Sequence, residues 1–207
     1  MKKIILLILL ITSFGLVKAQ ETSFVRKGLH VGAHVTPGIG TILTEAYDNL
    51  SVGAGLNAGL DINYYFNDLL GIRTGISYFN LPWRYESYYL DGSSNYNEIS
   101  ANVHSIGLPV QFLLTTGKKV VGFYLEAGFA VYFPVSYRSD LDKGILKTST
   151  VMFSSELAAG INLKANDKIN FQIAAFSNTS LPVFSNLDES YGFYNGLKLG
   201  MTINLSK

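Results

Sequence analysis

The chain has 207 residues, of which 48% are hydrophobic and 15% charged, and its formal net charge is +1. A typical soluble domain carries about a quarter of its residues as Asp, Glu, Lys and Arg, so this composition argues against a surface that faces water everywhere. The near-zero charge, without a dense run of Lys or Arg, excludes a nucleic-acid partner. The absence of Cys excludes disulfides, thiolate catalysis and Cys-based zinc sites.

The first segment is typical of a Sec-type signal peptide. Lys2 and Lys3 precede an apolar run, and Val17-Lys18-Ala19 forms a cleavage site. We therefore predict a signal peptide over residues 1–19 and one domain over residues 20–207. A transmembrane anchor is the weaker alternative, because the apolar run is shorter than the roughly 20 residues that a spanning helix needs. No second apolar stretch of that length follows, so only a closed barrel could span a membrane.

The mature region alternates apolar and polar residues with a period of two, which predicts strands. The clearest segment is 51–66, where the even-numbered residues are apolar; segments 121–135 and 151–163 repeat the pattern. Weaker alternation marks five further segments, namely 29–35, 70–78, 104–114, 169–175 and 193–205. The sequence thus predicts an all-β fold, a single antiparallel up-and-down transmembrane β-barrel of about eight strands.

The predicted connections are of two kinds. Short polar turns lie at 67–68, 116–119 and 166–167, and long loops at 37–50, 82–97, 136–147 and 180–190. Short turns on the side of both termini, with long loops directed outward, are typical of a bacterial outer-membrane barrel. Two aromatic girdles are expected, one of Tyr64, Tyr65, Phe66, Phe112 and Phe123 near the turns and one of Tyr78, Trp83, Tyr132, Phe133 and Phe193 near the loops.

The prolines lie mostly where strands are expected to meet long loops. Pro37, Pro82, Pro134 and Pro182 fit such boundaries, whereas Pro109 falls inside the segment 104–114. A proline there lacks an N–H for the ladder, so Pro109 predicts either a lost hydrogen bond or a bulge.

A soluble eight-stranded barrel of lipocalin type is the main alternative fold. In that fold the apolar face points inward and the other face meets water. In segment 51–66 the non-apolar face is small and rich in glycine, with Gly53, Gly55 and Gly59, where a soluble exterior favours Lys and Glu. Small residues suit a narrow barrel interior instead.

Several sequence features resemble the small outer-membrane β-barrel proteins of Bacteroidetes, the PorT-like or porin-like barrels. They are Lys18-Ala19-Gln20, Gly28-Leu29-His30-Val31-Gly32, Tyr64-Tyr65-Phe66-Asn67-Asp68 and Ile106-Gly107-Leu108-Pro109-Val110. The resemblance covers the mature chain and also accounts for Pro109, because a Pro step recurs in that strand of the family. Some relatives support protein secretion or gliding. The C-terminus departs from the pattern, since Leu205-Ser206-Lys207 lacks the terminal aromatic residue of many barrels, and insertion would depend on Ile203 and Leu205.

Charged and polar residues are expected inside the barrel. The predicted charge network consists of His30, His34, Asp61, Arg73, Glu126, Glu156 and Lys198, together with the polar residues Asn57, Gln111, Tyr124, Gln172 and Tyr194. Eight strands leave an interior that side chains can fill, and buried charges persist mainly when paired, so we interpret the network as structural. Asp61 and Arg73 flank the 67–68 turn at similar distances and should face one another. Glu126 and Glu156 are expected to share Lys198.

The sequence supports no catalytic or metal site and no cofactor. His30 and His34 would lie roughly 13 Å apart along a strand, too far for one ion. Asp140, Asp142 and Gly144 are similar to the start of a calcium loop, but Val151 occupies the place of its closing Glu. No Gly-x-Ser-x-Gly or His-Glu-x-x-His motif is present.

Aromatic residues in the second long loop are the candidates for interaction, namely Trp83, Tyr85, Tyr88 and Tyr89. Tyr among Gly and Ser is typical of binding loops, although these residues could instead extend the outer girdle. We therefore predict a monomeric, non-enzymatic barrel whose loops contact a surface protein or glycan, with outer-membrane lipid and the barrel-insertion machinery as its other partners. The alternatives are a narrow passive channel and, third, a lipid-acting enzyme.

Overall fold

The structure is a computed structural model that describes residues 27–44, 50–88, 96–116, 120–139, 148–183, 185 and 190–206. The predicted signal peptide, Tyr89 and the Asp140, Asp142 and Gly144 group lie outside these residues. All regular structure within the described ranges is β-strand, and no helix there has the length and apolar character to cross a membrane.

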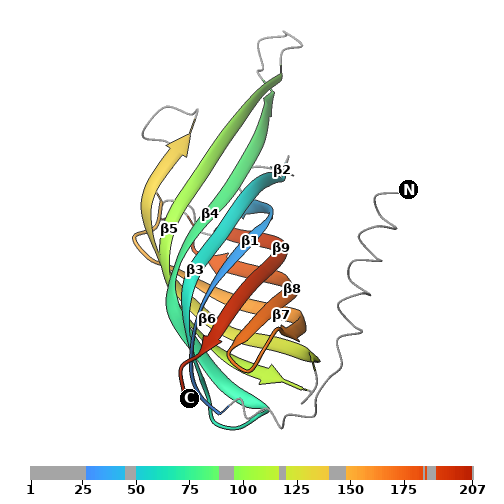
Figure 1. Cartoon of the computed structure of the whole chain (residues 1–207). Coiled ribbons are helices and arrows are strands. Elements are labelled where there is room, and N and C mark those ends of the chain that lie inside the picture. The colour runs from blue at the N-terminus through green and yellow to red at the C-terminus, as the bar shows by residue number, and fades with distance from the viewer. Residues whose placement is uncertain are drawn as a thin grey trace, which may run out of the picture.

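The strands form one closed antiparallel barrel (Figure 1). They are β1 (Gly28–Thr44), β2 (Leu50–Ser51), β3 (Gly53–Tyr65), β4 (Leu70–Tyr88), β5 (Tyr96–Thr115), β6 (Val121–Ser139), β7 (Met152–Lys164), β8 (Ile169–Leu181) and β9 (Ser190–Asn204). Pairing of β1 with β9 and of β4 with β5 closes the circle. The two-residue β2 pairs with β4 in line with β3, so the wall has eight long strands, which confirms the predicted fold.

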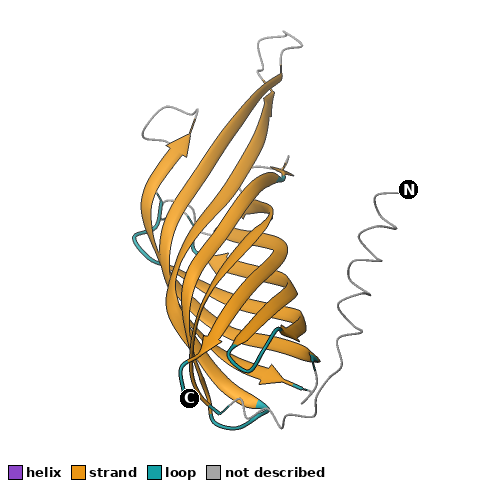
Figure 2. Cartoon of the chain, viewed as in Figure 1, coloured by secondary structure: helices purple, strands orange, loops and turns teal. Residues whose placement is uncertain are grey.

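The strands run further toward the long connections than the alternation predicted (Figure 2). Four segments assigned to long loops, namely 37–44, 82–88, 96–97 and 136–139, belong to strands β1, β4, β5 and β6. The ladder between β4 and β5 continues to the pair Tyr88↔Tyr96. Backbone pairing continues through these ends, although the apolar and polar alternation that marks a membrane strand is no longer required beyond the bilayer.

The outer wall is apolar and the interior is largely polar. Phe112, Phe123 and Phe129 are 73–74% exposed on the outside, whereas Arg73 and Glu126 are at most 1% exposed on the inside. This arrangement is the reverse of a soluble barrel and rules out the lipocalin alternative.

Two aromatic assignments to the girdles were wrong. Tyr65 and Tyr132 are 2% and 0% exposed and lie inside the barrel, because each stands at an inward position of its strand. Tyr64, Tyr78 and Phe133 do lie on the outer wall. The side chain of Trp83 lies outside the described part of the structure.

The prolines lie within strands more often than predicted. Pro37, Pro82 and Pro134 fall inside β1, β4 and β6, because those strands continue past them, whereas Pro182 follows the end of β8. Pro109 costs ladder pairing: the pairs between β4 and β5 are interrupted from Thr74↔Val110 to Ser77↔Gly107. The bulge in this region lies elsewhere, between His104 and Ser105.

Candidate functional site in the barrel interior

A charged cluster crosses the middle of the interior, with Glu126 on β6 at its centre. The Arg73 guanidinium on β4 donates to one oxygen of this carboxylate, and Tyr124 on β6 donates to the same oxygen. Lys198 on β9 donates to the other oxygen at 2.5 Å. Glu126, Arg73 and Lys198 are at most 2% exposed, so Glu126 is fully enclosed by two cations and a phenol.

Asp61 on β3 extends this cluster toward β1. Its Oδ2 lies 3.8 Å from Nη2 of Arg73 and 2.9 Å from Nδ1 of His34. The contact predicted between Asp61 and Arg73 is therefore present, on a diagonal, because the direct register partner of Arg73 is Asn63. Asn63 Oδ1 accepts a hydrogen bond from Nε of Arg73 at 3.0 Å.

Glu156 on β7 departs from the expectation that it shares Lys198 with Glu126. Its carboxylate accepts from three neutral donors, the Gln111 amide, the Tyr132 hydroxyl at 2.5 Å and the Asn178 amide at 3.1 Å. The sequence predicted one cation shared by two carboxylates, whereas in the structure one carboxylate, Glu126, pairs with two cations. Strand register could not reveal the pairing of Glu126, because Arg73 and Lys198 reach it from strands that are not neighbours of β6.

The two predicted histidines have different partners. His30 packs edge-on against Tyr65 at 4.9 Å between ring centroids. His34 lies between Asp61 and Asn57, with Nε2 3.0 Å from Asn57 Oδ1. Within the described residues, no group of three or more His, Cys, Asp or Glu side chains is arranged to hold a metal ion.

The remaining polar residues predicted for the interior are buried there as well. Gln172 accepts from Arg73 Nη2 at 3.0 Å, and the Tyr194 hydroxyl donates to the Thr36 carbonyl. Asn57 donates to the Tyr132 hydroxyl at 3.3 Å, which joins the Asp61 and Glu156 halves of the cluster. The charged cluster is therefore one continuous network.

An apolar cluster fills the interior on the loop side of the charged cluster, and the sequence interpretation missed it. Its members include Ile42, Phe79, Leu81, Val103, Met152, Val183 and Tyr194, each 0% exposed. The rings of Phe79 and Tyr194 meet at 5.2 Å between centroids, edge to face. The signal that was missed is strand parity, the alternation of inward and outward positions along a strand. Phe79, Leu81 and Val103 continue the inward positions of β4 and β5. The interior is thus filled at two levels.

A ring of polar residues encircles most of the outer wall near the loop side. Its members, called the polar ring below, are Thr41, Asn80, His104, Ser136, Ser155, Ser177, Thr179 and Asn195, one or two on every long strand except β3. Asn80, His104 and Ser136 are successive register partners, as are Ser155 and Thr179. Exposed apolar residues flank the ring on its loop side as well, at Leu43, Phe153 and Leu181.

The pairing of β4 with β5 continues past the ring members Asn80 and His104 to Tyr88↔Tyr96, and this hairpin extends beyond the other strands (Figure 1). Trp83, Tyr85 and Tyr88, predicted to lie in a loop, are on strand β4 and pair with Ala101, Ile99 and Tyr96. Their side chains lie outside the described part of the structure. These interaction candidates therefore stand on a projecting ladder, the β4–β5 projection, and not on a loop.

Comparisons with known proteins agree with this architecture. The family model for the outer membrane protein beta-barrel domain matches residues 18–206. The crystal structure of Neisserial surface protein A is similar, with a TM-score of 0.54 and 12% identity over 86% of this chain and 98% of that one. The outer membrane protein OprG of Pseudomonas aeruginosa is similar with a TM-score of 0.56 and 12% identity, over 87% and 97% of the two chains. Identities at this level show a shared fold. No curated protein sequence matches the chain.

Proposed function

Because the chain belongs to the outer membrane protein β-barrel domain family, we propose that it is a non-enzymatic scaffold of the outer membrane that presents its β4–β5 projection to a partner. The partner is a protein or glycan at the cell surface. The observation that carries the proposal is the ladder from Pro82↔Asn102 to Tyr88↔Tyr96, which continues beyond the polar ring. An element of paired strands that extends above a membrane suits recognition better than catalysis or transport.

The orientation of the chain follows from its connections. Asn67 and Asn166 lie in tight turns at one end of the barrel, and the C-terminal end of β9 pairs with β1 at that same end. In barrels of this kind, short turns face the periplasm and long connections face outward. The β4–β5 projection is then extracellular. We propose that a Sec-type signal exports the chain and that the barrel-insertion machinery inserts it.

The filled interior favours the scaffold function rather than the channel function. A solute would have to displace the apolar cluster around Phe79 and Tyr194 and then separate Arg73 from Glu126. Separating a buried ion pair costs several kcal/mol, because each buried charge would lose a direct counter-charge. Each long strand of the closed wall is also paired on both sides. The barrel therefore has no free strand edge to pair with a second chain, which favours a monomer.

We further infer that the chain belongs to the PorT-like barrels of Bacteroidetes within this family. The supporting residues are the Gly28-Leu29-His30 start of β1 and the Leu108-Pro109 step of β5, which interrupts the ladder to β4. A role in secretion or gliding would follow from that subgroup.

A binding measurement on variants of the β4–β5 projection tests the proposal. Vesicles carrying the folded mature barrel are applied to intact cells and to a glycan array, and retention is compared with that of the Tyr88→Ser, Tyr89→Ser double variant. Asn67, in a turn at the opposite end, supplies the matched control Asn67→Asp. We expect the double variant to lose retention and the control to keep it. Equal retention by all three proteins would refute the proposal.

A further inference from the structure

A groove lies on the outer, lipid-facing surface of the strands whose inner surface carries Asp61, Arg73 and Lys198. It crosses strands β4, β3, β1 and β9 and has a volume of about 700 Å³. One side is formed by a register row of outward-facing residues, Ile76, Leu60, Ala33 and Met201, each the direct partner of the next. The other side is the neighbouring register row toward the turns, which consists of Thr74, Ile62, Val31 and Ile203. The groove therefore follows the line between two rows of side chains.

Side-chain size explains why a hollow forms here. Ala33 is short and stands between Leu60 and Met201, which are 64% and 40% exposed. The floor is the backbone of Gly32, Asp61 and Gly75, whose positions face the interior. A side chain could not replace either glycine, since a Cβ would lie 2.5 Å from the Met201 carbonyl or 2.1 Å from the Leu60 carbonyl.

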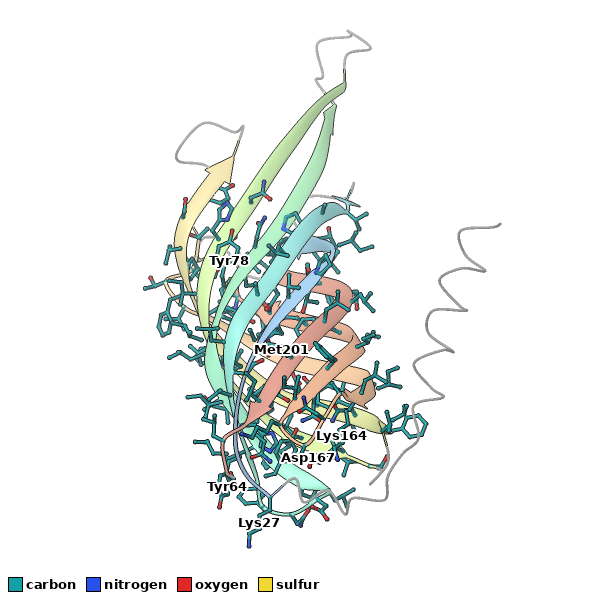
Figure 3. All side chains as sticks on the ribbon, in the orientation of Figure 1. Lys27, Tyr64, Tyr78, Lys164, Asp167 and Met201 are labelled. Atoms are coloured by element: carbon teal, nitrogen blue, oxygen red, sulfur yellow. The ribbon has the colours of Figure 1, made fainter. Side chains whose placement is uncertain are left out.

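The groove slopes through the apolar band. Its β4 end, at Ile76, is two residues from Tyr78 and close to the polar ring, whereas its β9 end, at Met201, is three residues from the turn-side end of the strand. Figure 3 shows Tyr78 nearer the loop side and Met201 nearer the turns. The groove thus has the course of a lipid chain that enters the bilayer from the loop-side interface.

A polar pair, Tyr78 and His104, lies next to the loop-side end of the groove, which is called its upper end below. The Tyr78 hydroxyl lies 2.6 Å from Nδ1 of His104, with the two rings stacked at 6.0 Å between centroids. When Tyr78 donates to Nδ1, the neutral imidazole carries its proton on Nε2, which remains a donor. Asn80, the register partner of His104, has a buried carboxamide oxygen without a partner. Hydrogen-bonding groups therefore gather where a lipid headgroup would lie.

We propose that the groove is a specific site for one membrane lipid with a phosphorylated headgroup. One acyl chain lies between the two register rows, and the headgroup is held beside Tyr78 and His104. An acyl chain suits the lining, because the side chains around it are predominantly apolar and lie within the hydrocarbon band. The pair at the upper end distinguishes this site from the ordinary lipid contacts of the rest of the wall.

Native mass spectrometry of the purified barrel tests the acyl-chain part. The full chain is folded in detergent micelles doped with palmitoyl-oleoyl-phosphatidylethanolamine, and bound lipid is counted for the wild type, Ala33→Phe and the control Ala127→Phe. Both alanines face outward, but Ala127 lies on β6, away from the groove. We expect one retained lipid in the wild type and in Ala127→Phe, and about tenfold less in Ala33→Phe.

Other results would overturn this assignment. Retention in Ala33→Phe equal to the wild type, or an equal loss in both variants, would show that the groove holds no specific lipid. A wild-type dimer that Ala33→Phe abolishes would identify a second copy of the chain as the occupant. Folding of each variant is checked by its shift in electrophoretic migration on heating.

The headgroup part has its own matched pair of variants. Tyr78 and Tyr64 are similarly exposed on the outer wall, at 39% and 44%, and each is two residues beyond a lining residue, Tyr78 from Ile76 toward the loops and Tyr64 from Ile62 toward the turns. Tyr78→Phe should lose the preference for phosphatidylethanolamine over diacylglycerol, whereas Tyr64→Phe should keep it. An unchanged preference in Tyr78→Phe would overturn the assignment of the headgroup.

Discussion

The guanidinium of Arg73 on β4 donates to the carboxylate of Glu126 on β6, across the barrel interior and past the intervening strand β5. Lys198 approaches the same carboxylate from β9 at 2.5 Å. Three strands that are not neighbours are thereby tied together inside the wall. Such a tie is expected to act on the stability of the whole barrel rather than on one hairpin.

Removing the charge of Glu126 should be far more damaging than removing that of Glu156. Glu126→Gln leaves Arg73 and Lys198 buried with their main counter-charge lost, a change that typically costs about 3 to 5 kcal/mol. Glu156→Gln alters a carboxylate held by neutral donors and should cost about 1 to 2 kcal/mol. Urea unfolding of the barrel in phospholipid vesicles measures both. Equal losses in the two variants would contradict the central role of Glu126.

The two levels of filling predict that the barrel does not conduct. In planar bilayers the wild type should insert without single-channel steps, because the apolar cluster and the charged cluster each close the interior. The double variant Phe79→Ala, Leu81→Ala should also show no single-channel conductance, since Arg73 and Glu126 still block the path. Stable steps from the wild type would instead support the channel alternative.

Much of the fold could be predicted from the sequence because a membrane strand must alternate. The lipid-facing residues Leu56, Leu60 and Phe129 cannot be polar, so the period of two is enforced wherever the wall crosses hydrocarbon. The same parity placed the charged residues inside. Where the wall leaves the bilayer, as in β4 after Pro82, the pattern stops although the strand continues, and the predicted ends were therefore too early.

The details of the interior depended on three-dimensional distances that parity does not supply. Parity assigned Glu126, Glu156 and Lys198 to the interior, and the predicted contact of Lys198 with Glu126 is present. Only the curvature of the closed wall decides that Glu156 has neutral donors instead of a share of Lys198. Tyr65 and Tyr132 were placed in the girdles by their position near strand ends. Their parity, which was the better guide, directs them inward.

Glycines at inward positions should differ sharply in their tolerance of a methyl group. A Cβ at Gly160 on β7 would lie 2.0 Å from the Ile173 carbonyl, so the backbone itself must shift. A Cβ at Gly200 on β9 would meet the Gln172 side chain at 3.1 Å and would lie in ordinary contact with the Ala33 carbonyl, at 3.6 Å.

We expect Gly160→Ala to cost about 1 to 3 kcal/mol of unfolding free energy and Gly200→Ala less than about 1 kcal/mol. Both values come from urea unfolding in the same vesicles, with the wild type as the reference. A larger loss in Gly200→Ala than in Gly160→Ala would show that the packing of the wall has been misassigned.

The tight turns should depend on the side-chain oxygen of their asparagine. Asn67 Oδ1 accepts from the backbone N–H groups of Leu69 and Leu70, both at 2.8 Å, and Asn166 Oδ1 accepts equivalently from Lys168 and Ile169. Asn67→Ala removes two hydrogen bonds and should cost about 1 to 2 kcal/mol, whereas Asn67→Asp keeps the acceptor and should cost little. Because the two turns share none of these contacts, Asn67→Ala and Asn166→Ala should add within about 0.5 kcal/mol when combined. An Asp variant as unstable as the Ala variant would show that the amide group, and not its oxygen, holds the turn.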